Sequence, residues 1–420
     1  MDTILEAIQL VENNQIEKAL KLLKDFSKAA NDDEKYTIAE LYLKWGFLEE
    51  AAGILHDLME KYPDESDLKL SLVDIYIEIE DDESAIALLD NIKEEDPEYV
   101  QALLQQADLY QAQGLFEVAE QKLLTAKNIL PNEVIIDFAL GELFFSIGEY
   151  LKAVTYYEKV AKEETLLAEV SILDRLAESY AAIGEYEKAI PYFKDGSEES
   201  PDKFYKYGVT ASQAGRNDIA IKAWKRVIER DEYYHSVYYN LAKALQEEGL
   251  LEESYQTAKR GLQIDSFNKQ LFLRAGMIAH QLNQEEESED FVRQAIALDP
   301  EYREAILFLL EFLKERNRYT EIIELLTEIK ATGSLEALFD WELARAYNEE
   351  EQYADALNAY KEAYINLNDD TDFLKEYGYF LTEEGLTPEA ITVFEKYLQQ
   401  IPDDYVIEEY VLRLKHPEEY

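Results

Sequence analysis

Apolar residues recur at helical spacing along the chain, in short runs that come in pairs. In the stretch from Ala39 to Pro63, one apolar run ends before Gly46 and a second begins at Leu48. Spacings of three and four residues within each run predict amphipathic helices, and the glycine between them predicts a tight turn. Pro63 follows the second run and cannot continue a helix. The pattern therefore predicts a helix, a turn and a second helix.

The same pattern returns about every 34 residues to the end of the chain. A small residue in the second helix marks nearly every unit, and successive markers are 31 to 36 residues apart. The markers are Ala19, Ala51, Ala85, Ala119, Ala153, Ala189, Ala220, Ser254, Ser288, Ile322, Ala356 and Ala390. A fixed period of this length is typical of repeat proteins, whose units stack because one helix pair cannot bury its apolar face alone.

The repeat resembles the tetratricopeptide repeat (TPR), as Leu103, Ala107, Tyr110, Gly114 and Ala119 illustrate in the fourth unit. The resemblance covers nearly the whole chain and implies an all-α fold, a right-handed TPR superhelix (α-solenoid) of about twelve helix-turn-helix repeats. We expect repeats 1–5 over residues 1–165 and repeats 6–12, continuous with them, over residues 166–402. An amphipathic capping helix and a tail should follow over residues 403–420.

Three places depart from the regular repeat. In the first unit, Asn14 replaces the turn glycine. In the tenth unit, Leu310 and Ile322 replace the usual small pair, which predicts helices that lie further apart or tilt. Between residues 162 and 206 the marker interval grows to 36 and then shrinks to 31, which predicts a local change in the superhelical path.

Composition narrows the class of protein. The chain has 90 Asp and Glu residues against 41 Lys and Arg, a formal net charge of −49, so the basic footprint that nucleic-acid binding needs is missing. The acidic surface keeps a long array soluble, attracts basic partners, or does both. There is no cysteine, no signal-peptide pattern, and no apolar run long enough for a bilayer. We expect a soluble cytoplasmic protein without membrane insertion.

Motifs of catalysis or metal binding are not visible in the sequence. GxGxxG, GxxxxGK[ST] and HExxH are all missing, and the four histidines are far apart in the repeat frame. Carboxylate clusters such as Asp81 to Glu83 and Asp369 to Asp372 fall between helices, where aspartate typically caps a helix start. We therefore expect no cofactor, no metal and no enzymatic activity.

The TPR resemblance implies that the first helix of each repeat lines a concave groove that binds the ligand. In repeats two to five these positions are acidic with an apolar stripe. They are Tyr36, Glu40, Leu43, Asp67, Leu70, Asp74, Ile77, Gln101, Leu104, Asp108, Gln111, Ile135, Phe138, Glu142 and Phe145. We expect partner contacts from Tyr36, Leu70, Leu104, Phe138 and Phe145.

The same positions in repeats six to nine are rich in cations and tyrosines. They are Arg175, Tyr205, Lys206, Tyr239, Asn240, Lys243, Arg274, Met277 and His280. Such a surface predicts binding of an acidic segment or a C-terminal carboxylate through charge-assisted hydrogen bonds. The alternative is pairing within the chain with Asp174, Glu178 and Glu247. The carboxylate clamp of chaperone-binding TPR proteins is matched only at Asn240 and Arg274.

Tryptophans divide between the groove and the core. Trp341, with Arg345 and Asn348, falls on the implied concave face of the eleventh repeat, where we expect it to be exposed for partner binding. Trp45 and Trp224 fall at or near packing positions.

The sequence as a whole resembles the YpiA-type cytoplasmic TPR proteins of low-GC Gram-positive bacteria, which implies a bacterial adaptor. We expect a non-catalytic scaffold that binds peptides or protein segments in the groove. The alternative is a regulatory receptor for a single short peptide that changes the superhelical pitch on binding. The oligomeric state does not follow from the sequence.

Overall fold

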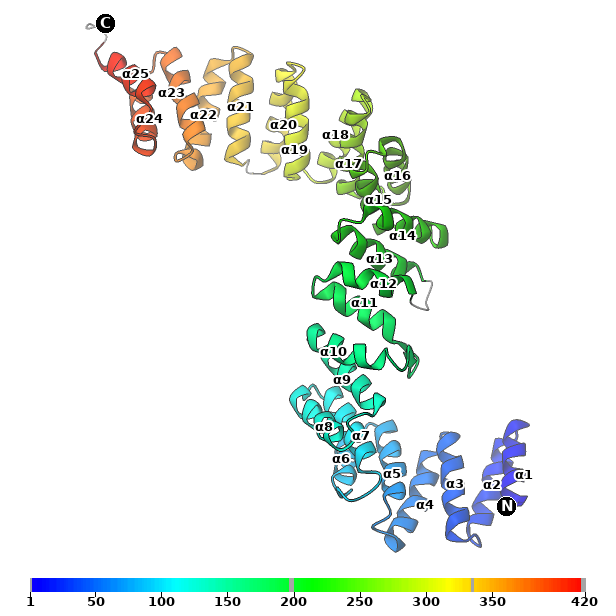
Figure 1. Cartoon of the computed structure of the whole chain (residues 1–420). Helices are drawn as coiled ribbons and strands as arrows, with labels where there is room; N and C mark the ends of the chain where they lie inside the picture. Colours follow the sequence, from blue (N-terminus) through cyan, green and yellow to red (C-terminus); the bar gives the residue numbers. More distant parts are fainter. Residues whose placement is uncertain (1, 196–199, 334–335, 417–420) are drawn as a thin grey trace. The chain divides into compact units, whose positions relative to one another are not determined.

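The computed structural model describes residues 2–195, 200–333 and 336–416 (Figure 1). Within these residues the chain forms 25 α-helices and one two-stranded hairpin, which confirms the all-α solenoid class. The helices belong to two compact units, residues 1–199 and 200–420. Residues 417–420 of the expected tail, and residues 196–199 of the segment with irregular spacing, lie outside the described residues.

The first unit contains six helix pairs. In each pair the odd-numbered helix is the first helix of a repeat and the even-numbered helix is the second. The helices are α1 (Asp2–Glu12), α2 (Ile16–Ser27), α3 (Asp32–Lys44), α4 (Leu48–Lys61), α5 (Ser66–Glu78), α6 (Asp82–Leu89), α7 (Tyr99–Ala112), α8 (Phe116–Ile129), α9 (Val134–Ser146), α10 (Tyr150–Val160), α11 (Ile172–Ala182) and α12 (Tyr186–Asp195).

The second unit contains six further pairs and one last helix. They are α13 (Pro201–Gln213), α14 (Asn217–Arg230), α15 (Ser236–Glu247), α16 (Leu251–Ile264), α17 (Lys269–Gln281), α18 (Glu285–Leu298), α19 (Arg303–Lys314), α20 (Tyr319–Thr332), α21 (Ala337–Glu349), α22 (Tyr353–Leu367), α23 (Thr371–Glu383), α24 (Thr387–Gln400) and α25 (Tyr405–Lys415). As predicted, α25 packs on α24 and buries Ile407 and Val411.

The two helices of a repeat pack through one small residue on the first helix and a residue sixteen positions later on the second. Where the first position is glycine, the second is a larger side chain that leaves no room for a Cβ atom. The pairs are Gly141 with Tyr157, Gly208 with Trp224, Gly276 with Val292, and Gly378 with Phe394, and an added Cβ would lie 2.3 to 2.7 Å from the partner side chain. Complementary volumes of this kind set the spacing of two helices in a close-packed interior.

Turns and helix starts follow the sequence expectations. Asn14 takes the left-handed conformation (φ 57°) that Gly46 adopts in the next repeat (φ 78°), since asparagine tolerates this region better than most residues. Asp81 and Asp370 accept backbone N–H bonds from Ser84 and Phe373, which confirms their capping role. Their carboxylates therefore stabilise helix starts.

A hairpin between the fifth and sixth repeats was not expected from the sequence. Strands β1 (Leu166–Leu167) and β2 (Val170–Ser171) pair antiparallel, and the turn residues Ala168 and Glu169 both have positive φ (47° and 63°). Turns of this kind favour Asn-Gly or Asp-Gly, so an Ala-Glu turn gave no hairpin signal. The hairpin accommodates the longer marker interval at this point.

The tenth repeat differs from the others as its bulky residues predict. Leu310 and Ile322 are both buried between α19 and α20, and within the described residues these two backbones pack less closely than the two helices of the other repeats. Large side chains at the crossing point keep the helix axes further apart.

Across the described ranges, no helix is both long and apolar enough to cross a membrane.

Candidate functional site

Neighbouring first helices contact each other through polar side chains about one repeat apart. Residues 35 apart form hydrogen bonds between Tyr36 and Ser71 (3.2 Å), between Gln111 and Ser146 (3.4 Å), and from Asn240 to Tyr205 (2.9 Å). These groups come from the positions that the sequence assigned to the groove. We call the surface formed by these positions of the first helices the first-helix face.

In the first unit, five carboxylates occupy the same repeat position on five successive first helices. This carboxylate row consists of Glu40, Asp74, Asp108, Glu142 and Glu178, on α3, α5, α7, α9 and α11. Each residue directly follows the residue that packs against the second helix of its repeat, which is alanine or glycine except at Val73. A single sign of charge is therefore repeated along the first-helix face at the spacing of the repeats.

Asp74 and Asp108 are two members of the row that lack a counter-ion among the described residues. Among the described residues, no lysine or arginine nitrogen lies within 4 Å of either carboxylate; Asp74 accepts one bond from the Gln105 amide (3.0 Å). Both side chains touch solvent, but surrounding protein atoms displace part of the water that would hydrate the charge. This desolvation raises the pKa of Asp74 and the pKa of Asp108.

Glu142, by contrast, is neutralised within the unit by Arg175. The Arg175 guanidinium donates to both Glu142 oxygens (2.8 and 2.9 Å) and lies 4.4 Å above the Phe145 ring centre. Arg175 also lies 3.9 Å from Glu178, one of the partners considered in the alternative prediction. The cation that the sequence assigned to an acidic ligand is thus already paired, because the preceding first helix supplies a carboxylate.

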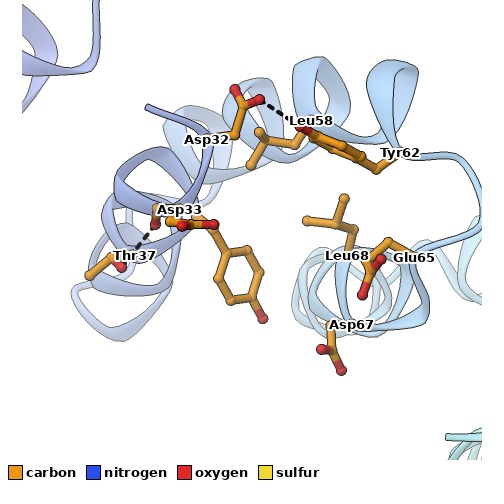
Figure 2. Close-up of a pocket in the computed structure, with 9 residues that line it drawn as sticks. Asp32, Asp33, Thr37, Leu58, Tyr62, Glu65, Asp67 and Leu68 are labelled. Atoms are coloured by element: carbon orange, nitrogen blue, oxygen red, sulfur yellow. Dashed lines mark hydrogen bonds between the residues drawn. The ribbon is translucent and has the colours of Figure 1, made fainter. Parts of the chain in front are cut away.

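A pocket of about 530 Å³ opens at one end of the row, between α3, the end of α4 and the start of α5. Figure 2 shows Leu58 and Leu68 pointing toward each other inside it, with Asp32, Glu65 and Asp67 around them. Tyr36 lines the pocket, as its groove position predicts. Asp32 accepts bonds from Lys61 (2.7 Å) and the Tyr62 hydroxyl (2.9 Å), so part of the acidic rim is held in place.

Several residues that line the pocket were not predicted from the sequence. Asp32, Tyr62 and Glu65 lie at helix ends and in the turn after α4, outside the positions assigned to the groove. The available signal was the gathering of acidic and tyrosine residues at 32–36 and 62–67, on either side of one second helix.

Three residues expected on the exposed groove are buried instead. Leu70, Phe138 and Trp341 are only 6, 8 and 7% exposed. Leu70 belongs to a core cluster with Ala102 and Leu109 of the next repeat, and Trp341 packs edge-on against Phe373 at 5.4 Å. Because the next repeat covers part of each first helix, apolar groove positions become packing positions. Leu104 and Phe145 remain partly exposed.

In the second unit, the expected tyrosines and cations lie on α13, α15 and α17. Asn240 donates to the Tyr205 hydroxyl, and Arg274 donates to the Tyr239 hydroxyl (3.1 Å). Lys206 and Lys243 are exposed, and Lys243 lies 3.9 Å from Glu247, the pairing that the alternative predicted. Trp224 is buried at 2% exposure, as predicted, and donates to the Tyr205 carbonyl (3.3 Å); Trp45 is half-buried.

Arg345 lines a second pocket, of about 420 Å³, formed by α19 to α23. It donates to both oxygens of Glu376, which also accepts bonds from the Trp341 indole (2.7 Å) and the Tyr360 hydroxyl (2.9 Å). Burial opposes ionisation of Glu376, but hydrogen bonds from Arg345 and Trp341 outweigh it and lower the pKa of Glu376. Within the described ranges, no group of three His, Asp or Glu side chains is placed to hold a metal.

The helix pairs and the first-helix face define a TPR solenoid, a class of protein that generally mediates protein–protein interactions. Models of TPR families match residues 46–107, 172–203, 205–269 and 270–302. Models described as YpiA-like tetratricopeptide repeats match residues 111–165, and YpiA-like C-terminal tetratricopeptide repeats match residues 338–404. The TPR repeat-containing protein YpiA of Bacillus subtilis (strain 168) is 42% identical over 418 residues, 99% of each chain. The chain belongs to the YpiA-like family of TPR proteins.

Solved structures with a similar fold are more distant. YrrB, described as a TPR protein with an unusual peptide-binding site, is 19% identical, with 44% of this chain and 95% of YrrB covered and a TM-score of 0.39. The APC/C hetero-tetramer Cut9–Hcn1 is 12% identical, with 97% of this chain and 95% of that chain covered and a TM-score of 0.32.

Proposed function

We propose that this protein is a non-catalytic cytoplasmic scaffold that binds segments of other proteins on its first-helix face. The observation that carries the proposal is the carboxylate row of the first unit, where Asp74 and Asp108 stand partly desolvated without a cation. A charge in such a place costs free energy that a cationic ligand would recover. The first unit is therefore proposed to bind a basic segment.

Repeat geometry sets the spacing of the cations in such a segment. Packed helices lie about 8–10 Å apart, and a polyproline II segment, in which every third side chain lies on the same face, rises about 3.1 Å per residue. A lysine or arginine at every third residue would therefore meet successive carboxylates of the row. The pocket lined by Leu58 and Leu68 would accept an apolar side chain from the same segment.

Replacing the two partly desolvated carboxylates, Asp74→Asn with Asp108→Asn, is expected to weaken binding of a repeated Lys-Leu-Ser peptide about tenfold. Fluorescence anisotropy of the labelled peptide measures the loss, which should shrink as salt is added. Asp57→Asn with Glu117→Gln removes the same charge from the second helices and serves as the control. Equal weakening by the two double variants would contradict the proposal.

The same double variant is expected to be more stable than the wild type at pH 7. Because folding raises the pKa of Asp74 and of Asp108, the folded state binds protons more readily, and stability falls as the pH rises through these pKa values. The difference should vanish below about pH 4, where aspartates of the unfolded chain are also protonated. Urea unfolding of both proteins, from pH 7 to below about pH 4, measures the difference in their free energies of unfolding.

A further inference from the structure

One pair of repeat positions on the first-helix face acts as a slot for two interacting side chains. The first position directly follows the small packing residue, and the second lies two residues before the small residue of the next repeat. The slot holds Asp74 with Gln105, Glu142 with Arg175, and Arg345 with Glu376, at hydrogen-bond distances of 2.5 to 3.0 Å. The charges can be exchanged between the two positions, as the last two pairs illustrate.

In the second unit, two cations occupy this slot. Lys243 follows the small residue Ala242, and Arg274 lies two residues before Gly276, with the same separation of 31 residues as between Arg345 and Glu376. Lys243 thus stands where Glu142 stands beside Arg175. The slot that holds a carboxylate in the Asp74, Glu142 and Glu376 pairs has no carboxylate of its own here.

Arg274 is held by neutral groups only. Its guanidinium donates to the Gln246 amide oxygen (2.8 Å) and to the Tyr239 hydroxyl, and lies 5.2 Å from the Tyr239 ring centre. The buried Nε atom has no hydrogen-bond acceptor in the described chain, and no described carboxylate lies within 4 Å of the guanidinium. Arg175, Arg318 and Arg345 all hold carboxylates in this acidic chain, so Arg274 is an exception.

We propose that Lys243 and Arg274 form a binding site for an aspartate or glutamate side chain of an acidic protein segment. The ligand carboxylate takes the place that Glu142 takes beside Arg175. Tyr239 and Gln246 orient the guanidinium, which pre-organises the site. This inference rests on the proposed function, because it names a second ligand class for the first-helix face.

The charge reversal Lys243→Glu gives the sharpest test, because it supplies the missing carboxylate from within. The variant is expected to lose binding of a repeated Glu-Leu-Ser peptide at least tenfold, and to gain stability as the slot closes. Fluorescence anisotropy with the blocked peptide measures binding, and hydrogen exchange of α15 and α17 measures stability. Lys222→Glu, an exposed change of the same sign on α14, should alter neither.

Arg274→Gln is a second test, and it is expected to weaken binding of the same Glu-Leu-Ser peptide about tenfold. A repeated Gln-Leu-Ser peptide is expected to bind weakly to every variant. Equal affinity for the Glu and Gln peptides, or unchanged binding in Lys243→Glu, would overturn the inference. So would binding of free citrate without binding of the Glu peptide. If the Lys-Leu-Ser peptide still binds the first unit in that case, the proposed function stands; if neither peptide binds, both fail.

Discussion

Gly208→Ala is expected to destabilise α13 and α14 by about 3 kcal/mol, the typical upper range for an overpacked core. A Cβ atom at this position would lie 2.3 Å from the Trp224 indole nitrogen, which is fully enclosed between the two helices. In an open helix position the same change stabilises by about 0.5–1 kcal/mol, so the sign itself is diagnostic. Native-state hydrogen exchange measures the local effect in a repeat protein whose units need not unfold together.

Gly53→Ala is the matched control, because the Cβ atom at this exposed site on α4 meets nothing within 4 Å. It is expected to stabilise its helix. Adding Trp224→Leu to Gly208→Ala should recover part of the loss, since the smaller side chain makes room for the new methyl group. A Gly208→Ala protein as stable as the wild type would contradict the account of how the helices pack.

Glu376→Ala is expected to destabilise α21 to α23 by about 2 kcal/mol. Its carboxylate accepts bonds from Trp341, Arg345 and Tyr360, and removing it leaves three donors without their acceptor. Breaking a fully buried ion pair costs about 3–5 kcal/mol, and solvent reaches about a third of both side chains here, which reduces the loss. Hydrogen exchange of the three helices measures the change.

The pH dependence of this effect has a defined sign. Since folding lowers the pKa of Glu376, its stabilising contribution is full above the ordinary glutamate pKa and is lost as the pH falls through the folded-state pKa. The difference in free energy of unfolding between wild type and Glu376→Ala should therefore decrease as the pH falls below about 4. Glu383→Ala, at an exposed position of the same pocket, should change stability by less than about 0.5 kcal/mol. Equal losses in the two variants would count against a specific role for Glu376.

The helix pairs were predictable because the same pattern of small and apolar packing residues recurs in nearly every repeat. The bulky residues Leu310 and Ile322 correctly predicted a wide helix crossing in the tenth repeat. The β-hairpin at residues 166–171 was missed because the Ala168–Glu169 turn has none of the residues that usually adopt positive φ.

The sequence assigned the residues of the candidate site to one face of the repeats, but it did not predict which residues contact one another. The repeat frame assigned Tyr36 and Arg274 to the first-helix face, where Tyr36 lines a pocket and Arg274 donates to the Tyr239 hydroxyl. It could not tell that Leu70 and Trp341 are covered by the next repeat, since exposure depends on how deeply neighbouring first helices overlap. Nor did it reveal the Glu142–Arg175 pair, whose 33-residue separation becomes a contact only after stacking.

Photo-cross-linking of the repeated Lys-Leu-Ser peptide tests the central claim most directly. A photoreactive group in place of one leucine, followed by mass spectrometry of the adducts, locates the bound segment on the first unit. The proposed function predicts adducts on α3, α5 and α7, next to Glu40, Asp74 and Asp108, and their loss in the Asp74→Asn, Asp108→Asn variant. Adducts on the second helices α6 and α8 instead would contradict it.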